Sequence, residues 1–215
     1  MTPLDAKIKE LRERLKLLPP AKRCAFSAAC SERFIGLYGE FSKKDGWGNP
    51  DTLREILELV WLSTTQEQES PSREGLKAAL DLVINSLTPH TDLFSSMECV
   101  LAQAVCSSLE AAIKSRLNTL DANIDEGNPV GSPFEAIRAA VCLSETGYVD
   151  LGDLPEAAEF EAHLLEDLRV RKELDWQQQD LELLSRSPVD PDITLYLKER
   201  AAENRWTVRQ LLPIQ

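Results

Sequence analysis

Apolar side chains recur every three or four residues along most of the chain, and this spacing constrains the fold more than any other feature. Residues 3–18 show it clearly, because five aliphatic side chains there fall on one face of a helix: Leu4, Ile8, Leu11, Leu15 and Leu18. No segment alternates with period two over more than a few residues. We therefore predict an all-α fold without a sheet.

Proline and glycine divide these periodic segments. Pro19-Pro20 ends the first helix, because the residue before a proline is pushed out of the α region. Gly46 suits the left-handed position that ends the second helix, and Asn49-Pro50 begins the third with a capping side chain. The second helix covers about residues 21–44. The fourth begins at Ser70-Pro71, the next three cover residues 92–120, 133–146 and 155–185, and the eighth begins at Asp190-Pro191.

The connections between these segments are mostly short, which favours antiparallel neighbours in one compact bundle of about seven to eight helices. We predict a single domain over residues 1–215, in which residues 1–18 form a peripheral helix and residues 204–215 a tail that packs back or frays. Residues 92–120 are apolar on more than one side. We expect this long helix to lie at the centre of the bundle.

The net charge of −12 argues against nucleic acid as the main partner, because phosphate neutralisation needs a positive face. It permits a basic protein partner through electrostatic steering, although solubility alone also explains it. Residues 150–186 carry a net charge of −7, so the helix over 155–185 is a candidate acidic face. No run of 18 uncharged apolar residues occurs, and the first helix lacks the apolar core of a signal peptide. We predict a cytoplasmic protein that does not enter membranes.

The chain shows no familiar catalytic or metal-binding motif. It lacks glycine-rich phosphate loops, H-E-x-x-H and G-x-S-x-G. His90 and His163 are 73 residues apart, and each is explained more simply as a surface side chain. The cysteines are odd in number and lie in apolar segments, which indicates buried thiols. We predict no catalytic residue, no metal site and no cofactor; the cysteines are Cys24, Cys30, Cys99, Cys106 and Cys142.

Residues 23–61 mix charged and aromatic side chains on two predicted helices. Arginine beside aromatic rings makes stacking or cation–π contacts, and with carboxylates it lines polar grooves. The alternative is structural, namely an arginine–glutamate bridge at the edge of the core that involves Glu32. The candidate residues for a groove that binds a ligand or a partner are Arg33, Tyr38, Arg54 and Trp61.

The same stretch resembles a known protein family. The resemblance is carried by a motif that a glycine-containing turn interrupts: Arg23, Phe26, Ala29-Cys30, Glu32-Arg33, Tyr38 and Phe41, then Leu57 and Trp61. This motif is similar to that of an uncharacterised bacterial family, domain of unknown function 416 (YjaG-like), whose C-terminal part also has an acidic helix with a tryptophan, as in Glu173 to Trp176 here. The resemblance covers about residues 20–212 and implies an all-α cytoplasmic bacterial protein. It transfers no catalytic residue.

Three functions fit these observations. The first is a non-enzymatic protein with an interaction or structural role, since no nucleophile, base or metal set converges. The second is an acidic inhibitor or immunity-type protein that masks a basic toxin or nuclease with residues 150–186. The third is an enzyme with an unrecognised helical active site around Arg33 and Tyr38. The identity of the partner and the oligomeric state do not follow from the sequence.

Overall fold

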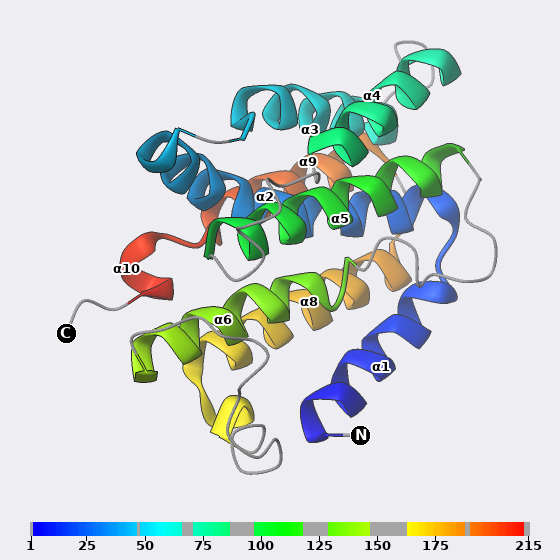
Figure 1. Ribbon diagram of the computed structural model, residues 1–215. Coiled ribbons are helices and arrows are strands. Elements are labelled where there is room, and N and C mark those ends of the chain that lie inside the picture. Colours follow the sequence, from blue (N-terminus) through cyan, green and yellow to red (C-terminus); the bar gives the residue numbers. More distant parts are fainter. Residues whose placement is uncertain are drawn as a thin grey trace.

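The computed structural model of the chain consists of α-helices (Figure 1). It describes residues 2–46, 48–65, 71–86, 97–117, 129–146, 163–187 and 190–212, and none of these residues forms a strand. The predicted all-α fold is therefore confirmed. The helices are α1 (Pro3–Lys16), α2 (Pro20–Asp45), α3 (Pro50–Thr65), α4 (Arg73–Ser86), α5 (Met97–Leu117), α6 (Ser132–Thr146), α8 (Leu168–Arg186), α9 (Pro191–Glu203) and α10 (Val208–Leu211).

Side-chain caps explain where several helices begin. The Asn49 side chain accepts a hydrogen bond from the backbone N–H of Thr52 at 3.2 Å, and that of Asp190 accepts one from Ile193 at 2.8 Å. These bonds satisfy backbone donors that the first turn of a helix leaves without partners. The starts of α3 and α9 both agree with the predictions from the sequence. Helix α4 begins a little later than predicted, because Ser72 rather than Ser70 caps it, through the backbone N–H of Gly75.

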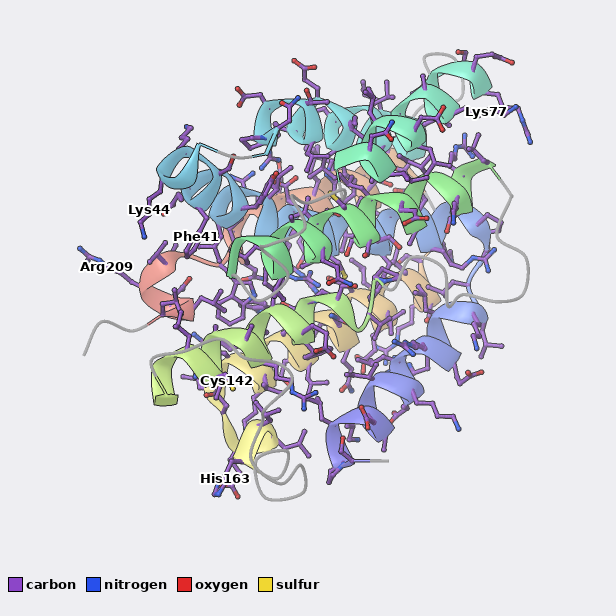
Figure 2. All side chains as sticks on the ribbon, viewed as in Figure 1. Phe41, Lys44, Lys77, Cys142, His163 and Arg209 are labelled. Atoms are coloured by element: carbon purple, nitrogen blue, oxygen red, sulfur yellow. The ribbon has the colours of Figure 1, made fainter. Side chains whose placement is uncertain are left out.

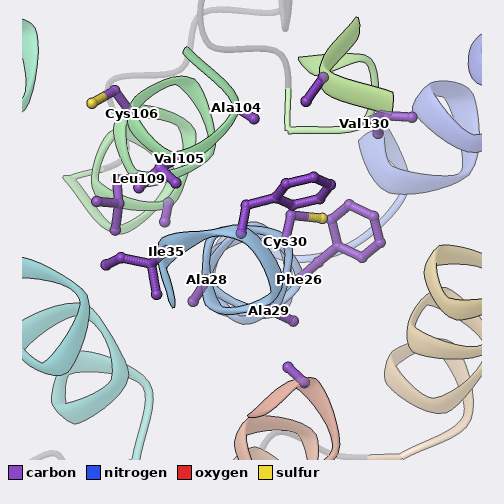
Figure 3. Close-up of a cluster of buried hydrophobic side chains, with 14 of the residues drawn as sticks. Phe26, Ala28, Ala29, Cys30, Ile35, Ala104, Val105, Cys106, Leu109 and Val130 are labelled. Carbon is purple, nitrogen blue, oxygen red and sulfur yellow. The ribbon is translucent and has the colours of Figure 1, made fainter. Parts of the chain in front are cut away.

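Helix α2 runs through the middle of the bundle. It packs against α3, α5, α8 and α9, and Figure 3 shows its small and apolar side chains pointing to several neighbours at once. Ala25, Ala28 and Ala29 are fully buried, which lets other helices approach closely. Helix α5, the described part of the predicted central helix, lies beside α2 and contacts α3, α4 and α6 as well.

The sequence predicts one helix over residues 155–185, and this prediction is wrong at Asp167. Residues 155–162 lie outside the described part of the chain, residues 163–166 are helical, and Asp167 is extended. Its carboxylate accepts hydrogen bonds from the backbone N–H of Arg169 at 2.7 Å and from the same residue's guanidinium. Aspartate competes for backbone donors in this way, so it caps α8 instead of continuing the earlier turn.

Residues 204–212 of the C-terminal tail pack back onto the bundle. Trp206 and Leu211 are buried, and the backbone N–H of Trp206 donates to the Arg33 carbonyl oxygen at 2.9 Å. The tail therefore lies against α2. Buried apolar side chains from α1 through α10 form one continuous cluster, which this tail helps to close.

Two further expectations concern cysteine and histidine. Cys24, Cys30, Cys106 and Cys142 are buried free thiols, as predicted, and burial raises the pKa of Cys24 and of Cys106 to about 12. His163 is exposed and projects from the surface in Figure 2, which confirms its prediction. The side chains of Cys99 and His90 lie outside the described residues. None of the described helices is both long enough and apolar enough to cross a lipid bilayer.

The turn between α2 and α3 depends on two glycines with positive φ, Gly46 at +66° and Gly48 at +90°. Gly46 is the left-handed residue that ends α2, as the sequence predicts. A Cβ atom at Gly48 would overlap the hydroxyl of Tyr38, which accepts a hydrogen bond from the backbone N–H of Asn49 at 3.3 Å. Nothing lies within 4 Å of a Cβ atom at Gly46.

We predict that Gly48→Ala lowers the free energy of unfolding by about 1–3 kcal/mol, because alanine strains this backbone and displaces Tyr38. Gly46→Asn is the matched control. Asparagine tolerates the left-handed region, so this change costs less than about 1 kcal/mol. Urea unfolding followed by tryptophan fluorescence measures both values. Equal losses in the two variants would contradict the proposed role of Gly48.

Candidate functional site

The four candidate residues do not gather around one site. Arg33 is 1% exposed, Tyr38 is 0% exposed and Trp61 is 2% exposed. Only Arg54 keeps a third of its side chain, 33%, in contact with solvent. Arg54 and Trp61 meet at the carboxylate of Glu32, whereas Arg33 faces α8 and Tyr38 faces the turn before α3. The predicted groove itself stays a prediction.

Arg33 is the centre of a sealed ion-pair network, which we call the inner network: Arg33, Glu173, Asp180 and Arg200. The Arg33 guanidinium donates to Glu173 Oε1 from Nε at 3.1 Å and from Nη2 at 2.9 Å. Its Nη1 donates to Asp180 Oδ2 at 2.8 Å, and Arg200 pairs with the other oxygen of Asp180. The network thus ties α2 to α8 and α9.

Neutral side chains complete the inner network. Trp206 donates its indole N–H to Glu173 Oε2 at 3.1 Å, and Gln177 donates to Glu173 Oε1 at 3.0 Å. The Trp206 ring packs edge-on against Trp176, with the centroids 5.1 Å apart. The buried Gln177 Oε1 accepts no hydrogen bond from the described residues. Two arginines face two carboxylates, so the network is neutral as a unit.

The electrostatics keep Arg33 charged in the core. Burial alone would lower the pKa of Arg33, but the negative charges of Glu173 and Asp180 outweigh it and raise that pKa above its ordinary value. Cys30 lies 3.3 Å from the guanidinium through its sulfur, yet burial raises the pKa of its thiol well above the ordinary value. A thiol that stays protonated is a poor nucleophile. Cys30 is therefore not an activated nucleophile in this environment.

The preceding residue of α2, Glu32, organises a second cluster, the outer network: Glu32, Arg54, Arg205, Glu58 and Lys198. Arg54 Nη1 lies 2.8 and 3.0 Å from the two carboxylate oxygens of Glu32, and Trp61 donates its indole N–H at 3.3 Å. Arg205 donates from Nε at 3.0 Å and also from Nη2. Lys198 pairs with Glu58 at 2.6 Å. This cluster joins α2, α3, α9 and the tail.

Glu32 is ionised within this cluster. Burial tends to raise the pKa of its carboxyl group, but hydrogen bonds from Arg54 and Arg205 and their positive charges hold that pKa below its ordinary value. Arg54 and Glu32 form the arginine–glutamate bridge that the sequence offers as the alternative to a binding groove. The outer network has three cations for two carboxylates, and Arg205 keeps 43% of its side chain exposed.

Sequence reasoning missed most of the partners of Arg33 and Glu32. Asp180 and Gln177 were not singled out, and Arg200 and Arg205 lay in segments with weak apolar spacing. One signal was available: Glu173, Gln177 and Asp180 recur at intervals of four and three on the face of α8 that also carries Val170 and Leu184. Polar residues at such core-facing positions indicate buried partners elsewhere.

A family model for proteins of unknown function, DUF416, matches residues 10–207. The chain belongs to the DUF416 family. This confirms the resemblance seen in the sequence. The crystal structure of a DUF416 family protein from Shewanella baltica OS155 is similar, with a TM-score of 0.64 and 20% sequence identity over 89% of this chain and 92% of that one. At this identity the likeness shows a shared fold. No curated protein matches the chain.

We predict that Arg33→Met lowers the free energy of unfolding by about 3–5 kcal/mol, because it leaves Glu173 and Asp180 buried without their cation. Lys16→Gln is the control. Lys16 pairs with Glu13 at 2.9 Å on the surface, and losing such a pair costs less than about 1 kcal/mol. Guanidinium unfolding measures both. A loss below about 1 kcal/mol for Arg33→Met would show that the inner network contributes little.

The lowered pKa of Glu32 makes its contribution to stability depend on pH. A carboxyl group whose pKa is depressed by folding stabilises the protein above its unfolded pKa, and the contribution is lost as pH falls through the folded pKa. We predict that Glu32→Gln destabilises the protein at pH 7 and that the difference from the unsubstituted protein shrinks by pH 3. All other carboxylates are common to both chains. Urea midpoints at the two pH values measure the change, and a constant difference would contradict it.

Proposed function

We propose that this DUF416 family member is a non-enzymatic cytoplasmic protein that binds another protein along the surface between α3 and α9. The observation that carries the proposal is a pair of half-exposed apolar side chains at one end of this surface. We call it the α3–α9 surface and define it by four residues: Glu58, Leu62, Leu195 and Lys198.

The outer network fixes how α3 and α9 lie against each other. Glu32 joins Arg54 to Arg205, and one turn further along α3 Glu58 pairs with Lys198. From Arg54 to Glu58 the residue numbers rise along α3, while those of the paired residues fall from Arg205 to Lys198. Helix α3 therefore runs antiparallel to the segment formed by α9 and the tail. One more turn along α3 leads to Leu62, on the side of α9 that carries Leu195, three residues before Lys198.

Both apolar side chains are unusually accessible for large residues. Leu62 is 45% exposed and Leu195 is 52% exposed. Tyr196 is also 52% exposed, but it lies two residues from Lys198 and so points to another side of α9. Exposed apolar side chains that cluster mark interaction sites more often than scattered ones do. Elsewhere in the described chain, Leu82 and Ile84 are exposed on α4 but lie two residues apart, which points them to different sides of the helix. Leu17 and Leu168 each stand alone on their elements.

The occupant that fits this surface is an apolar-faced segment of a different protein. A second copy of this chain would carry the same net charge of −12, which repels it. The burial and pairing of Arg33 and Tyr38 support a role without chemistry at these residues, because solvent reaches neither side chain. The inhibitor alternative gains no support from α8: its four acidic and four basic side chains cancel, and two of the acids face the core.

We predict that a photo-crosslinking phenylalanine analogue at Leu195, introduced in cells that express the protein from its own gene, yields one discrete adduct. The same analogue at Leu168, a still more exposed leucine on α8, yields none of that mass. We expect that adding Leu62→Asp to the protein with the analogue at position 195 abolishes the adduct, because the charge disrupts apolar docking. Denaturing electrophoresis with mass spectrometry identifies the product.

Several results of this experiment would overturn the proposed function. Identical adducts from positions 195 and 168 would indicate non-specific contact. An adduct of twice the mass of the chain would assign the surface to self-association. An adduct that survives Leu62→Asp would place the contact outside the α3–α9 surface.

A further inference from the structure

We infer that Arg54 and Arg205 form a binding site for one carboxylate group of the partner protein. The inference rests on the proposed function, because the site lies at the far end of the same surface. It deepens that function by naming the chemical group that accompanies the apolar contact. The site is built from three side chains: the two arginines, and the buried Glu32 that holds them from behind.

Glu32 holds the two guanidinium groups in place, and each group still has N–H donors available to a ligand. Glu32 is fully buried and binds Arg54 through Nη1 and Arg205 through Nε and Nη2. Arg54 Nε and Nη2 and Arg205 Nη1 donate to no described acceptor. Neither Arg54 Nε nor Arg54 Nη2 is sealed from solvent, and Arg205 keeps 43% of its side chain exposed. Donors that are held in position before a ligand arrives lose little side-chain entropy on binding it.

Glu32 accepts hydrogen bonds from two arginines but neutralises only one of them. A carboxylate offers about four lone-pair positions, and those of Glu32 already receive Arg54, Arg205 and the indole of Trp61. In the inner network Asp180 also binds two arginines, but Glu173 supplies the second negative charge. The outer network sets Arg54, Arg205 and Lys198 against Glu32 and Glu58, so one positive charge is uncompensated. A single external carboxylate balances it.

The charge and shape of the site favour a carboxylate over a phosphate. A carboxylate is planar and presents two oxygens to the edge of a guanidinium, and such charge-assisted bonds are among the stronger hydrogen bonds. Its single negative charge equals the local surplus. A dianionic phosphate exceeds that surplus on a protein that already carries −12.

The position of the site fits a peptide segment that also reaches the apolar end. Arg54, Glu58 and Leu62 are spaced by four residues and share one face of α3. Eight residues of helix span about 12 Å, so the arginines and Leu62 are about that far apart along the axis. An aspartate, a glutamate or a chain terminus about two helical turns from an apolar side chain meets both ends of the surface.

The test is a titration of the purified full-length protein with sodium acetate, at ionic strength held constant with sodium chloride. The side-chain Nε–H signals of Arg54 and Arg205 are followed by nitrogen-15 NMR. We expect both to shift saturably with a dissociation constant on the order of 10 mM. The Nε–H signal of Arg186, a highly exposed arginine paired loosely with Glu182 at 4.0 Å, shows no saturation and serves as the internal control.

Conservative variants separate the site from general electrostatics. Arg54→Lys keeps the charge and spares the fold, but it removes the fork that binds two oxygens, so acetate binding read at Arg205 weakens about tenfold. Arg186→Lys leaves acetate binding unchanged. Linear shifts in all arginines, an unaltered affinity in Arg54→Lys, or saturation by inorganic phosphate at lower concentration than acetate would each overturn the inference.

This outcome can be told apart from failure of the proposed function. If the Leu195 adduct forms but acetate does not saturate the arginine signals, the docking surface stands and the carboxylate site is wrong. If acetate saturates the arginines and no adduct forms, the site binds carboxylates outside any contact with a protein at Leu195, and the partner assignment is wrong.

Discussion

The structure depends on the ion pairs between Arg33 and the two carboxylates Glu173 and Asp180. These pairs link residues separated by 140 and 147 positions, so they fix how the second helix of the chain meets the eighth. Removing charges from water costs several kcal/mol per ion, and only good geometry with further hydrogen bonds offsets that cost. Arg200, Trp206 and Gln177 supply those bonds. The docking of α9 and the tail is therefore part of the same electrostatic unit.

Consecutive residues of α2 divide the bundle between two such units. Side chains of neighbouring helical residues point about 100° apart, so Arg33 pairs with α8 while Glu32 pairs with α3 and the tail. A shift of α2 by one residue would exchange a cation for an anion on both sides. Apolar packing tolerates small changes in register, whereas buried charge does not. Arg33 and Glu32 thus select one register of α2 among those that the surrounding alanine and phenylalanine side chains would allow.

Local features of the fold follow from the sequence, and contacts between distant segments do not. Asn49, Asp190 and Gly46 act on their own backbone neighbours, so the helix limits they set are readable from spacing and residue type. Asp167 acts just as locally, but the acidic residues around it look like a continuous helical surface. The roles of Glu173 and Arg205 depend on which elements meet in space. Arg33 and Glu32 were identified as unusual because their charges lie among aromatics, while their partners carry no such local sign.

The difference between the two networks has an electrostatic cause. A sealed cluster is stable only when its charges cancel, because surplus charge in a medium of low polarisability is costly. The inner network meets this condition with two arginines and two carboxylates. The outer network keeps a surplus cation, and it does so where Arg54 and Arg205 reach solvent. Surplus charge is thus confined to the rim of the core, about two helical turns along α3 from the half-exposed Leu62. The requirements of the core thereby leave donors without described acceptors and an accessible apolar side chain along α3, the combination on which the proposed recognition of a protein rests.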